Sequence, residues 1–448
     1  MAPLPTFHNP AISLWQSAIN EVLAQQHANQ PQVLGDEAPP VPSSQAPIML
    51  QAVAAATAIM SGKPVPPAVL GIPVEDCAKL YLQLVLAQAQ GDQQQVERLK
   101  DEIEFSTCDP LWAKCFLEYQ KFRLFSSGQI PYRRYQSLDD YILPLTGKNP
   151  AAIKIALIAD WGTGEPPARQ LLAEVGRQAP DMLIHLGDIY YSGTSREVQE
   201  RFLNVCRATP GLNIPTYTLA GNHDMYSGGQ SYYWLLDQLG QPASYFCLRN
   251  DDWQLLAMDT GLHDADPGTV VSNLTYLDER ELAWQRDKIA NAGGRKTILL
   301  SHHQLFSASG GVGNTPDGKP LALNSRLYAG FADVLDQVAL WMWGHEHNLI
   351  AYDAYAGLAR GRCNGSAAVP TMVAQNPYTP DPNLVLPVGQ SSPPIINASC
   401  RLGDNGEFYH HAYAMLTLKG KAADISYYQI PGENAHRELI FVEHIEAE

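Results

Sequence analysis

Acidic, amide and imidazole side chains follow short apolar runs at several points from residue 153 onward. The runs end in Asp160-Trp161-Gly162, Gly187-Asp188, Gly221-Asn222-His223-Asp224, Ser301-His302-His303 and Gly344-His345-Glu346-His347. Carboxylate and amide oxygens and imidazole nitrogens are the side-chain atoms that bind divalent metal ions in proteins. If the residues that follow these runs lie together in the fold, they predict a metal site.

Each motif by itself also has a plain structural interpretation. A Gly-Asp pair is common in turns, and His302-His303 could be a hydrogen-bonded core pair or lie beside a helix start. His345-x-His347 is more specific, because alternate residues of an extended segment point in the same direction. The motifs together, each at the end of an apolar run, favour a metal site over a set of unrelated structural roles.

The elements that must position these residues are strands and helices in alternation. Apolar runs at 153–159 and 182–186 are separated by the length of one crossover helix, which predicts a βαβ unit with an aspartate at each strand tip. Further strands are expected at 216–220, 253–258, 297–300 and 338–343. Ligands of open α/β sheets lie outside the carboxyl ends of the strands, so we expect Asp160 and Asp188 to face one crevice.

The rest of this region completes an α/β domain. Residues 278–291, followed by Gly293-Gly294, are typical of a capped helix. Residues 364–399 are rich in Pro, Gly, Ser and Asn, which predicts a long loop near the site. Apolar and polar residues alternate over 409–428, and this pattern predicts closing strands.

Residues 1–148 differ from this pattern and carry no recognisable chemistry. Helical spacing of apolar residues predicts helices at 14–25, 78–89, 97–105 and 111–125, divided by proline-rich stretches. We therefore expect a helical accessory domain at 1–148. Its expected role is packing or the binding of a protein partner, which could be an oligomer contact.

Charge and cysteine content narrow the class of protein. The net charge of −16 over 448 residues argues against a nucleic-acid partner or an anionic membrane, because phosphate groups are bound through Lys and Arg. Seven cysteines without a Cys-x-x-Cys pair predict reduced thiols rather than a disulfide framework or zinc cluster. The sequence shows no secretory signal, and no apolar run reaches the roughly 20 residues that span a bilayer. We expect a cytoplasmic location without membrane contact.

The ordered motifs resemble the five sequence blocks of the calcineurin-like metallophosphoesterases. The residues that carry the resemblance are Asp160-x-Gly162, Gly187-Asp188-x-x-Tyr191, Gly221-Asn222-His223-Asp224, Leu299-x-x-His302 and Gly344-His345-x-His347. Within that superfamily, residues 150–440 are most similar to the small, single-catalytic-domain purple acid phosphatases. The resemblance implies an αββα sandwich for a metallophosphoesterase catalytic domain at 149–448.

Carried over residue by residue, the resemblance implies two metal ions. Asp160, Asp188, Tyr191 and His347 would hold the first, and Asp188, Asn222, His302 and His345 the second, with Asp188 as the bridge. Gly162 stands where many relatives have a histidine ligand, and Tyr191 is its expected replacement. A phenolate is a hard anionic donor that favours a trivalent ion, so Fe(III) is expected at the Tyr191 site and Fe, Zn or Mn at the other.

The resemblance also implies the catalytic roles. Two metal ions about 3.5–4 Å apart can supply a hydroxide nucleophile and stabilise the charge of an in-line displacement. His223 would contact the phosphate or protonate the leaving oxygen, so His223 and Asp188 are the catalytic candidates. His303 is a weaker candidate for the proton donor, and a structural role for it stays open. Residues 310–313 are Gly-Gly-Val-Gly where many purple acid phosphatases have a further histidine.

Hydrolysis of phosphate monoesters, with a small phosphorylated molecule as substrate, is the function that we expect. The predicted ligands do not separate a monoesterase from a phosphodiesterase that acts on nucleotides or other diesters. A metal-binding interaction protein without turnover is the third alternative. The complete set of ligands weighs against it, because a decayed site should lack some of them.

Overall fold

The computed structural model describes residues 87, 91–103, 118–119, 122–123, 128–267 and 273–447. The chain divides into one compact unit of Met1–Gln129, Tyr226–Gly228 and Asp266–Val271, and a second of Ile130–Met225, Gly229–Ala265 and Ser272–Glu448. The first unit contains helix α4, Gln93–Ile103, which overlaps the helix expected at 97–105. The helices expected at 14–25, 78–89 and 111–125 lie wholly or mostly outside the described residues. No helix of the described residues is long and apolar enough to cross a membrane.

The second unit is built on two β-sheets. Along the seven-stranded sheet the order is β1 (Ile142–Pro144), β5 (Phe246–Arg249), β6 (Trp253–Ala257), β7 (Lys296–Leu300), β8 (Val338–Trp343), β10 (Gly361–Asn364) and β9 (Leu349–Ala351). Along the six-stranded sheet the order is β13 (Glu438–Ile445), β12 (Ala422–Ile430), β11 (His411–Lys419), β2 (Ile153–Ile158), β3 (Met182–His185) and β4 (Thr216–Thr218).

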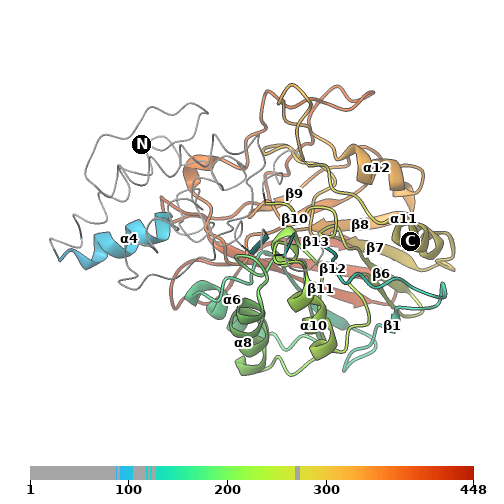
Figure 1. Ribbon diagram of the computed structural model, residues 1–448, viewed down its shortest axis with the longest axis horizontal. Coiled ribbons are helices and arrows are strands. Elements are labelled where there is room, and N and C mark those ends of the chain that lie inside the picture. The colour runs from blue at the N-terminus through green and yellow to red at the C-terminus, as the bar shows by residue number, and fades with distance from the viewer. Residues whose placement is uncertain are drawn as a thin grey trace, which may run out of the picture. The chain divides into compact units, whose positions relative to one another are not determined.

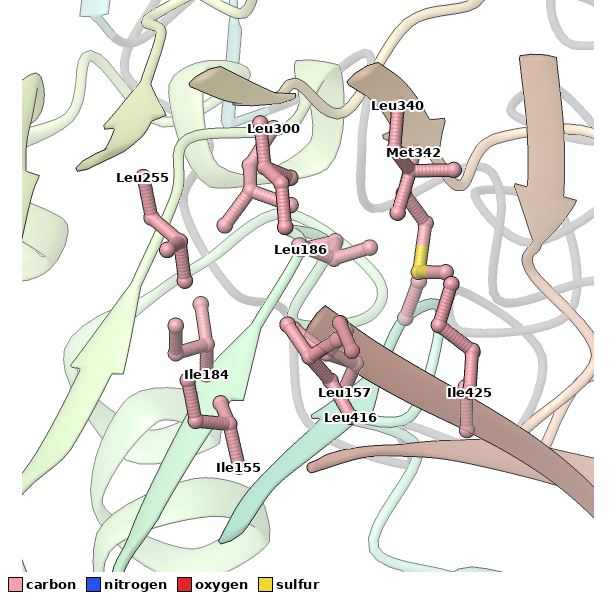
Figure 2. Close-up of a cluster of buried hydrophobic side chains, with 14 of the residues drawn as sticks. Ile155, Leu157, Ile184, Leu186, Leu255, Leu300, Leu340, Met342, Leu416 and Ile425 are labelled. Carbon is pink, nitrogen blue, oxygen red and sulfur yellow. The ribbon is translucent and has the colours of Figure 1, made fainter. Parts of the chain in front are cut away.

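The main hydrophobic core lies between the two sheets. Figure 2 shows side chains of one sheet, such as Ile155 and Ile184, directed toward side chains of the other, such as Leu255 and Leu300. These side chains are fully buried, so the facing sides of the central strands are removed from water. Burial of apolar area on this scale is the dominant favourable term in folding and fixes how the sheets face each other.

Helices cover the outer faces of both sheets. The helices of this unit are α6 (Pro166–Arg177), α7 (Ser195–Glu197), η1 (Val198–Leu203), α8 (Asn204–Ala208), α9 (Asn222–Met225), α10 (Gln230–Leu239), α11 (Glu279–Ala290), α12 (Ser325–Phe331), η2 (Leu335–Gln337) and η3 (Val373–Gln375). Residues of α6, η1 and α8 pack on the six-stranded sheet, and residues of α11 and α12 pack on the seven-stranded sheet, on opposite sides of the two sheets (Figure 1). The predicted αββα sandwich is confirmed.

The strands expected from the sequence are present with nearly the expected bounds. The runs at 153–159, 182–186, 216–220, 253–258, 297–300 and 338–343 correspond to β2, β3, β4, β6, β7 and β8. The closing strands expected at 409–428 correspond to β11 and β12. The helix expected at 278–291 is α11, and the Asp278 side chain caps it by accepting a hydrogen bond from the Arg280 amide. Short strands β1, β5, β9 and β10 and the final strand β13 were not predicted.

The accessory domain expected at 1–148 falls largely on residues outside the described set and stays a prediction. Its last part is described and belongs to the second compact unit, which begins at Ile130. There β1 pairs in parallel with β5, with Leu143 opposite Leu248.

The direction of the strands brings their carboxyl ends to one place. Strands β2, β3 and β4 run parallel in one sheet, and β6, β7 and β8 run parallel in the other. Parallel neighbours end at the same edge of a sheet, which is where α/β proteins place ligands. The residues that follow these strands form the site described next.

Candidate metal centre

Residues from both sheets converge at the carboxyl ends of these strands. Ligand-type atoms of Asp160, Asp188 and His302 lie within 4.8 Å of one another, and the same holds for His302, His303 and His345. All of these side chains are buried. Asp160 and Asp188 therefore lie close together, and β7 and β8 add imidazoles from the opposite sheet.

The backbone at four predicted ligands is left-handed. The φ angles are 55° at Asp160, 76° at Asp188, 69° at His345 and 50° at His347. Non-glycine residues rarely adopt this conformation, and where they do the surrounding structure must hold them there, most often at functional sites. Close packing of the motif glycines does part of this, because a Cβ on Gly221 would lie 2.0 Å from Asp188 Oδ1.

Asp160 connects the loop after β2 with the loop after β8. Its Oδ2 accepts a hydrogen bond from the His345 amide at 2.8 Å. Its Oδ1 lies 3.5 Å from His347 Nε2. A Cβ on Gly344 would lie 2.7 Å from Asp160 Oδ2, so glycine at that position permits the contact between the two loops.

Asp188 has one satisfied and one unsatisfied oxygen. Its Oδ1 accepts a hydrogen bond from the His223 amide at 3.0 Å. Its Oδ2 is buried and has no hydrogen-bond partner among the described residues, although it lies 3.3 Å from His302 Nε2. Burial pushes the pKa of Asp188 upward, but the nearby His302 and His223 hold that pKa well below its usual range, so the carboxylate is ionised.

The ring of His302 is oriented for coordination through Nε2. Its Nδ1 lies 3.0 Å from the Leu186 carbonyl oxygen, which fixes that nitrogen as the hydrogen-bond donor. Three polar atoms then crowd Nε2: Asn222 Oδ1 at 3.1 Å, His345 Nδ1 at 3.2 Å and Asp188 Oδ2 at 3.3 Å. One imidazole nitrogen offers a single proton or a single lone pair, so it cannot satisfy all three. A cation among these atoms would, and the donor set therefore fits a metal ion.

His223 lies beside Asp188 with its other nitrogen occupied. Its Nδ1 lies 2.6 Å from the Tyr191 carbonyl oxygen, and its Nε2 lies 3.8 Å from Asp188 Oδ2. Burial lowers the pKa of His223, against the opposing charge of Asp188. The Nε2 atom thus faces the cluster, as the predicted catalytic role requires.

Asp224 is a residue of the site to which the sequence assigned no role. Its carboxylate accepts hydrogen bonds from the amides of Asp188 at 3.0 Å, Ile189 at 3.2 Å and Gly221 at 2.8 Å. It therefore ties the loop after β3 to the loop after β4 and positions Asp188 against Asn222. Its place in the Gly221-Asn222-His223-Asp224 motif was the available signal.

The residue before the predicted ligand Tyr191 also lies against two predicted ligands. The hydroxyl of Tyr190 lies 2.9 Å from Asp160 Oδ1 and 2.9 Å from His347 Nε2. Burial and the charges of Asp160 and Asp188 raise the pKa of Tyr190 well above its usual range, so the hydroxyl donates to Asp160. The ring of Tyr191 lies 5.4 Å from the Arg201 guanidinium carbon. Tyr190 is thus a second residue of the site to which the sequence assigned no role, and Tyr191 as a metal ligand stays a prediction.

The comparisons with known proteins agree with this geometry. Residues 153–349 match the family model described as calcineurin-like phosphoesterase. This part of the chain is a calcineurin-like phosphoesterase domain. The resemblance expected from the motifs is confirmed, and the family typically binds two metal ions and comprises hydrolases of phosphate esters.

Curated relatives of this chain include both kinds of esterase. Glycerophosphodiester phosphodiesterase GpdQ of Enterobacter lignolyticus is 25% identical over 242 residues, which cover 53% of this chain and 78% of that protein. Tartrate-resistant acid phosphatase type 5 of Rattus norvegicus is 24% identical over 231 residues, covering 44% and 68%. Among solved structures, one described as PhoD is 12% identical and covers 68% of this chain and 72% of that chain, with a TM-score of 0.46.

His303 is held at the border of the candidate metal centre by hydrogen bonds from both ring nitrogens. Its Nε2 lies 3.0 Å from Asp264 Oδ2, and its Nδ1 lies 2.9 Å from Thr260 Oγ1. Its ring centroid lies 4.5 Å from that of His345. These partners favour the structural role that the sequence left open, in which the His303 ring packs against that of His345.

Proposed function

We propose that this phosphoesterase hydrolyses phosphate monoesters at a dinuclear metal centre. The crowding of Asn222, His345 and Asp188 around Nε2 of His302 carries the proposal, because a metal ion between these atoms can be bound by all of them. The similarity to an acid phosphatase supports the choice of monoesters. The proposed substrate is a small phosphorylated molecule.

The predicted ligands divide between two ions. Asp160, Tyr191 and His347 would belong to the first, and Asn222, His302 and His345 to the second. Asp188 would bridge them, in keeping with a carboxylate whose second oxygen has no hydrogen-bond partner among the described residues. Two such ions supply Lewis acidity and an activated water for in-line displacement at phosphorus.

The chain's own residues position the reactants and move protons. His223 would bind a phosphate oxygen through Nε2 or give a proton from that atom to the leaving oxygen, with Nδ1 fixed on the Tyr191 carbonyl. Asp224 would hold the loop that carries Asp188, through its hydrogen bonds to backbone amides. The buried walls of the site would limit access of bulk water to the cleaved bond.

A phosphodiesterase is the second candidate, and a specific observation favours it. GpdQ is named a glycerophosphodiester phosphodiesterase, and a further relative, CpdA of Escherichia coli, is named a 3',5'-cyclic adenosine monophosphate phosphodiesterase and is 26% identical over 128 residues. CpdA matches 29% of this chain and 42% of its own length, so this second likeness covers a smaller part of the fold. The predicted ligands serve either reaction.

The deciding experiment compares an aryl phosphate monoester with the matching diester. The full chain is stripped with a chelator, resupplied with Fe, Zn or Mn, and assayed for release of the aryl alcohol. Metal-dependent turnover with a higher kcat/KM for the monoester is the expected result. A higher kcat/KM for the diester would transfer the proposal to the phosphodiesterase.

Asp188→Asn is the blank for this assay, and Asp353→Asn is its matched control. The second substitution makes the same chemical change at an exposed position. Activity that is lost in Asp188→Asn and kept in Asp353→Asn supports the proposed centre. Two bound ions without turnover toward either ester would favour the catalytically silent interaction protein instead.

Three further expectations remain proposals. Iron as the native metal of the first site follows from the expected phenolate ligand. A protein partner or oligomer contact through residues 1–148 and a cytoplasmic location follow from the sequence alone.

A further inference from the structure

Two buried carboxylates, those of Asp259 and Glu281, lie together at the start of the loop that follows β6. Both side chains are fully buried. Glu281 Oε1 accepts a hydrogen bond from the Asp259 amide at 2.9 Å, so one acid contacts the backbone that carries the other. The Tyr132 hydroxyl donates to Glu281 Oε2 at 2.7 Å, and the Leu262 amide donates to Asp259 Oδ1 at 2.9 Å. These hydrogen bonds all come from neutral groups.

Within the part of the chain that the structure describes, no lysine or arginine is among the main groups that act on either acid. Arg133 and Arg134 follow Tyr132 in the chain, but they pair with Asp237 and Asp278, each at 2.8 Å. The other titratable side chains that face the two acids are those of Tyr132, Tyr232, Tyr233 and Tyr245, with Asp224 acting on Tyr232.

The absence of a compensating cation has a consequence for the protonation of the pair. Burial raises the pKa of Asp259 to about 6. Burial, together with the charge of Asp259, raises the pKa of Glu281 well above its usual range. Two neighbouring buried carboxylates titrate as a pair, and the second charge is much more costly than the first. The pair therefore keeps one proton at neutral pH.

The loop that begins at Asp259 holds His303 beside the candidate metal centre. Thr260 Oγ1 accepts a hydrogen bond from the His303 amide at 3.0 Å and lies 2.9 Å from His303 Nδ1. Asp264 Oδ2 lies 3.0 Å from His303 Nε2. The His303 ring packs against that of His345, with 4.5 Å between their centroids. Residues 259–264 thus connect the acid pair with a predicted metal ligand.

The same loop also packs against the turn that carries Asn222. A Cβ on Gly261 would lie 2.4 Å from the Gly221 carbonyl oxygen, so the two backbones are in close contact. Asn222 follows Gly221 directly in the chain. A displacement of the loop would therefore loosen the surroundings of two predicted ligands, Asn222 and His345.

We propose that Asp259 and Glu281 are positioning residues that share one proton, and that this proton keeps residues 259–264 packed against the candidate metal centre. When the O–H bond of the shared proton breaks, the proton passes to solvent and two negative charges remain in a buried position. Opening of the loop hydrates these charges and relieves their repulsion. The inference rests on the proposed function only for its effect on turnover, which we expect to fall at alkaline pH.

The test compares wild type, Glu281→Gln and Glu279→Gln in the full chain. Glu281→Gln stays neutral at every pH and keeps an oxygen for the Asp259 amide. Glu279 lies on the same helix, α11, at an exposed position, so Glu279→Gln is the matched control. Hydrogen–deuterium exchange of residues 259–264 is measured from pH 6 to pH 9, and the proteins are compared at equal pH so that the intrinsic pH dependence of exchange cancels.

We expect the exchange rate of wild type, divided by that of Glu281→Gln, to rise with pH. A raised pKa in the closed state gives stability that is lost as the pH rises through that value, so the ratio should rise by up to about tenfold per pH unit. Glu279→Gln should follow wild type. In metal-loaded protein, the alkaline limb of kcat/KM for an aryl phosphate should move to higher pH in Glu281→Gln alone.

The two measurements separate this inference from the proposed function. A ratio that does not change with pH, or an unchanged alkaline limb, overturns the inference. Wild-type protein without turnover under any metal overturns the proposed function, while the exchange rates still decide whether the acid pair holds the loop. If Glu281→Gln does not fold, Asp259→Asn replaces it, because that variant also removes one of the two charges and should give the same change in the ratio.

Discussion

The ion pair between Arg362 and Glu443 joins the two sheets, and its removal should be strongly destabilising. Arg362 lies on β10 of the seven-stranded sheet and Glu443 on β13 of the six-stranded sheet. Two parallel hydrogen bonds connect them, from Nε at 2.8 Å and from Nη2 at 2.6 Å. Tyr427 adds a third bond to the same carboxylate, also at 2.6 Å. The side chains of Arg362 and Glu443 are 8% and 9% exposed, so solvent screens the pair weakly.

The magnitude follows from what Glu443→Gln leaves behind. The guanidinium keeps its bonds to the Tyr352 and Gly361 carbonyls, both at 2.7 Å, but its charge becomes uncompensated in a buried position. Breaking a buried pair in this way costs about 3–5 kcal/mol in the free energy of unfolding. Replacing both partners, as in Arg362→Met with Glu443→Leu, should recover most of that loss, because the pair itself is close to neutral relative to apolar packing.

The pair should also make stability depend on acid pH. Burial raises the pKa of Glu443, but Arg362 outweighs it and holds the pKa below the usual value. A depressed folded-state pKa gives stability that is present above the unfolded value of about 4.3 and is lost as the pH falls through the folded value. The difference in the free energy of unfolding between wild type and Glu443→Gln should therefore be largest at neutral pH. It should be smaller near pH 3.

Urea unfolding followed by tryptophan fluorescence measures these differences. The fully buried tryptophans of this unit are Trp161, Trp253, Trp284, Trp341 and Trp343. Asp333→Asn is the control, since it removes a carboxylate from an equally close pair with Arg286 whose side chains are 66% and 37% exposed. If Glu443→Gln lowers the free energy of unfolding by as little as Asp333→Asn does, the argument that the pair is buried and connects the sheets is refuted.

The remaining predictions concern the site and a second buried acid. Metal at 100 times its Kd should stabilise wild-type protein by about 2.7 kcal/mol, which is measured as a higher melting temperature. Asp188→Asn should abolish that increase. An unchanged increase would show that Asp188 is not a ligand. Glu281 is fully buried and accepts a hydrogen bond from Tyr132 at 2.7 Å. Burial, with the charge of Asp259, raises the pKa of Glu281 well above its usual range, so its contribution is present at low pH and is lost as the pH rises through that value. Melting temperatures from pH 5 to pH 9 should therefore fall more for wild type than for Glu281→Gln, and parallel curves would contradict this. His303→Gln should lower kcat by about 10–100-fold while leaving metal content unchanged, because outer partners of ligands have effects of this size; lost metal would instead make His303 a ligand.

Local sequence pattern determined the strands that carry the site. Each of the runs that became β2, β3, β4, β7 and β8 is apolar and is followed directly by a glycine turn, an acid, an amide or an imidazole. Burial of both faces gives these strands continuous apolar runs, which are visible without knowledge of any neighbour. The sequences of β1, β9 and β10 are too short or mix too many polar residues to show this pattern. Their pairing depends on other strands of the sheet.

Only the tertiary structure showed that the Tyr190 hydroxyl lies against Asp160 and His347. In a regular strand, alternate residues point to opposite faces, so spacing predicts direction. The loop after β3 is not regular: Asp188 has a left-handed backbone, the Tyr191 amide donates to Glu197, and Arg201 donates to the Tyr190 carbonyl. The sequence could thus name the residue types that gather at the site, because those follow from the ends of strands. It could not give the direction of each side chain, because that depends on contacts made only when the loops and both sheets come together.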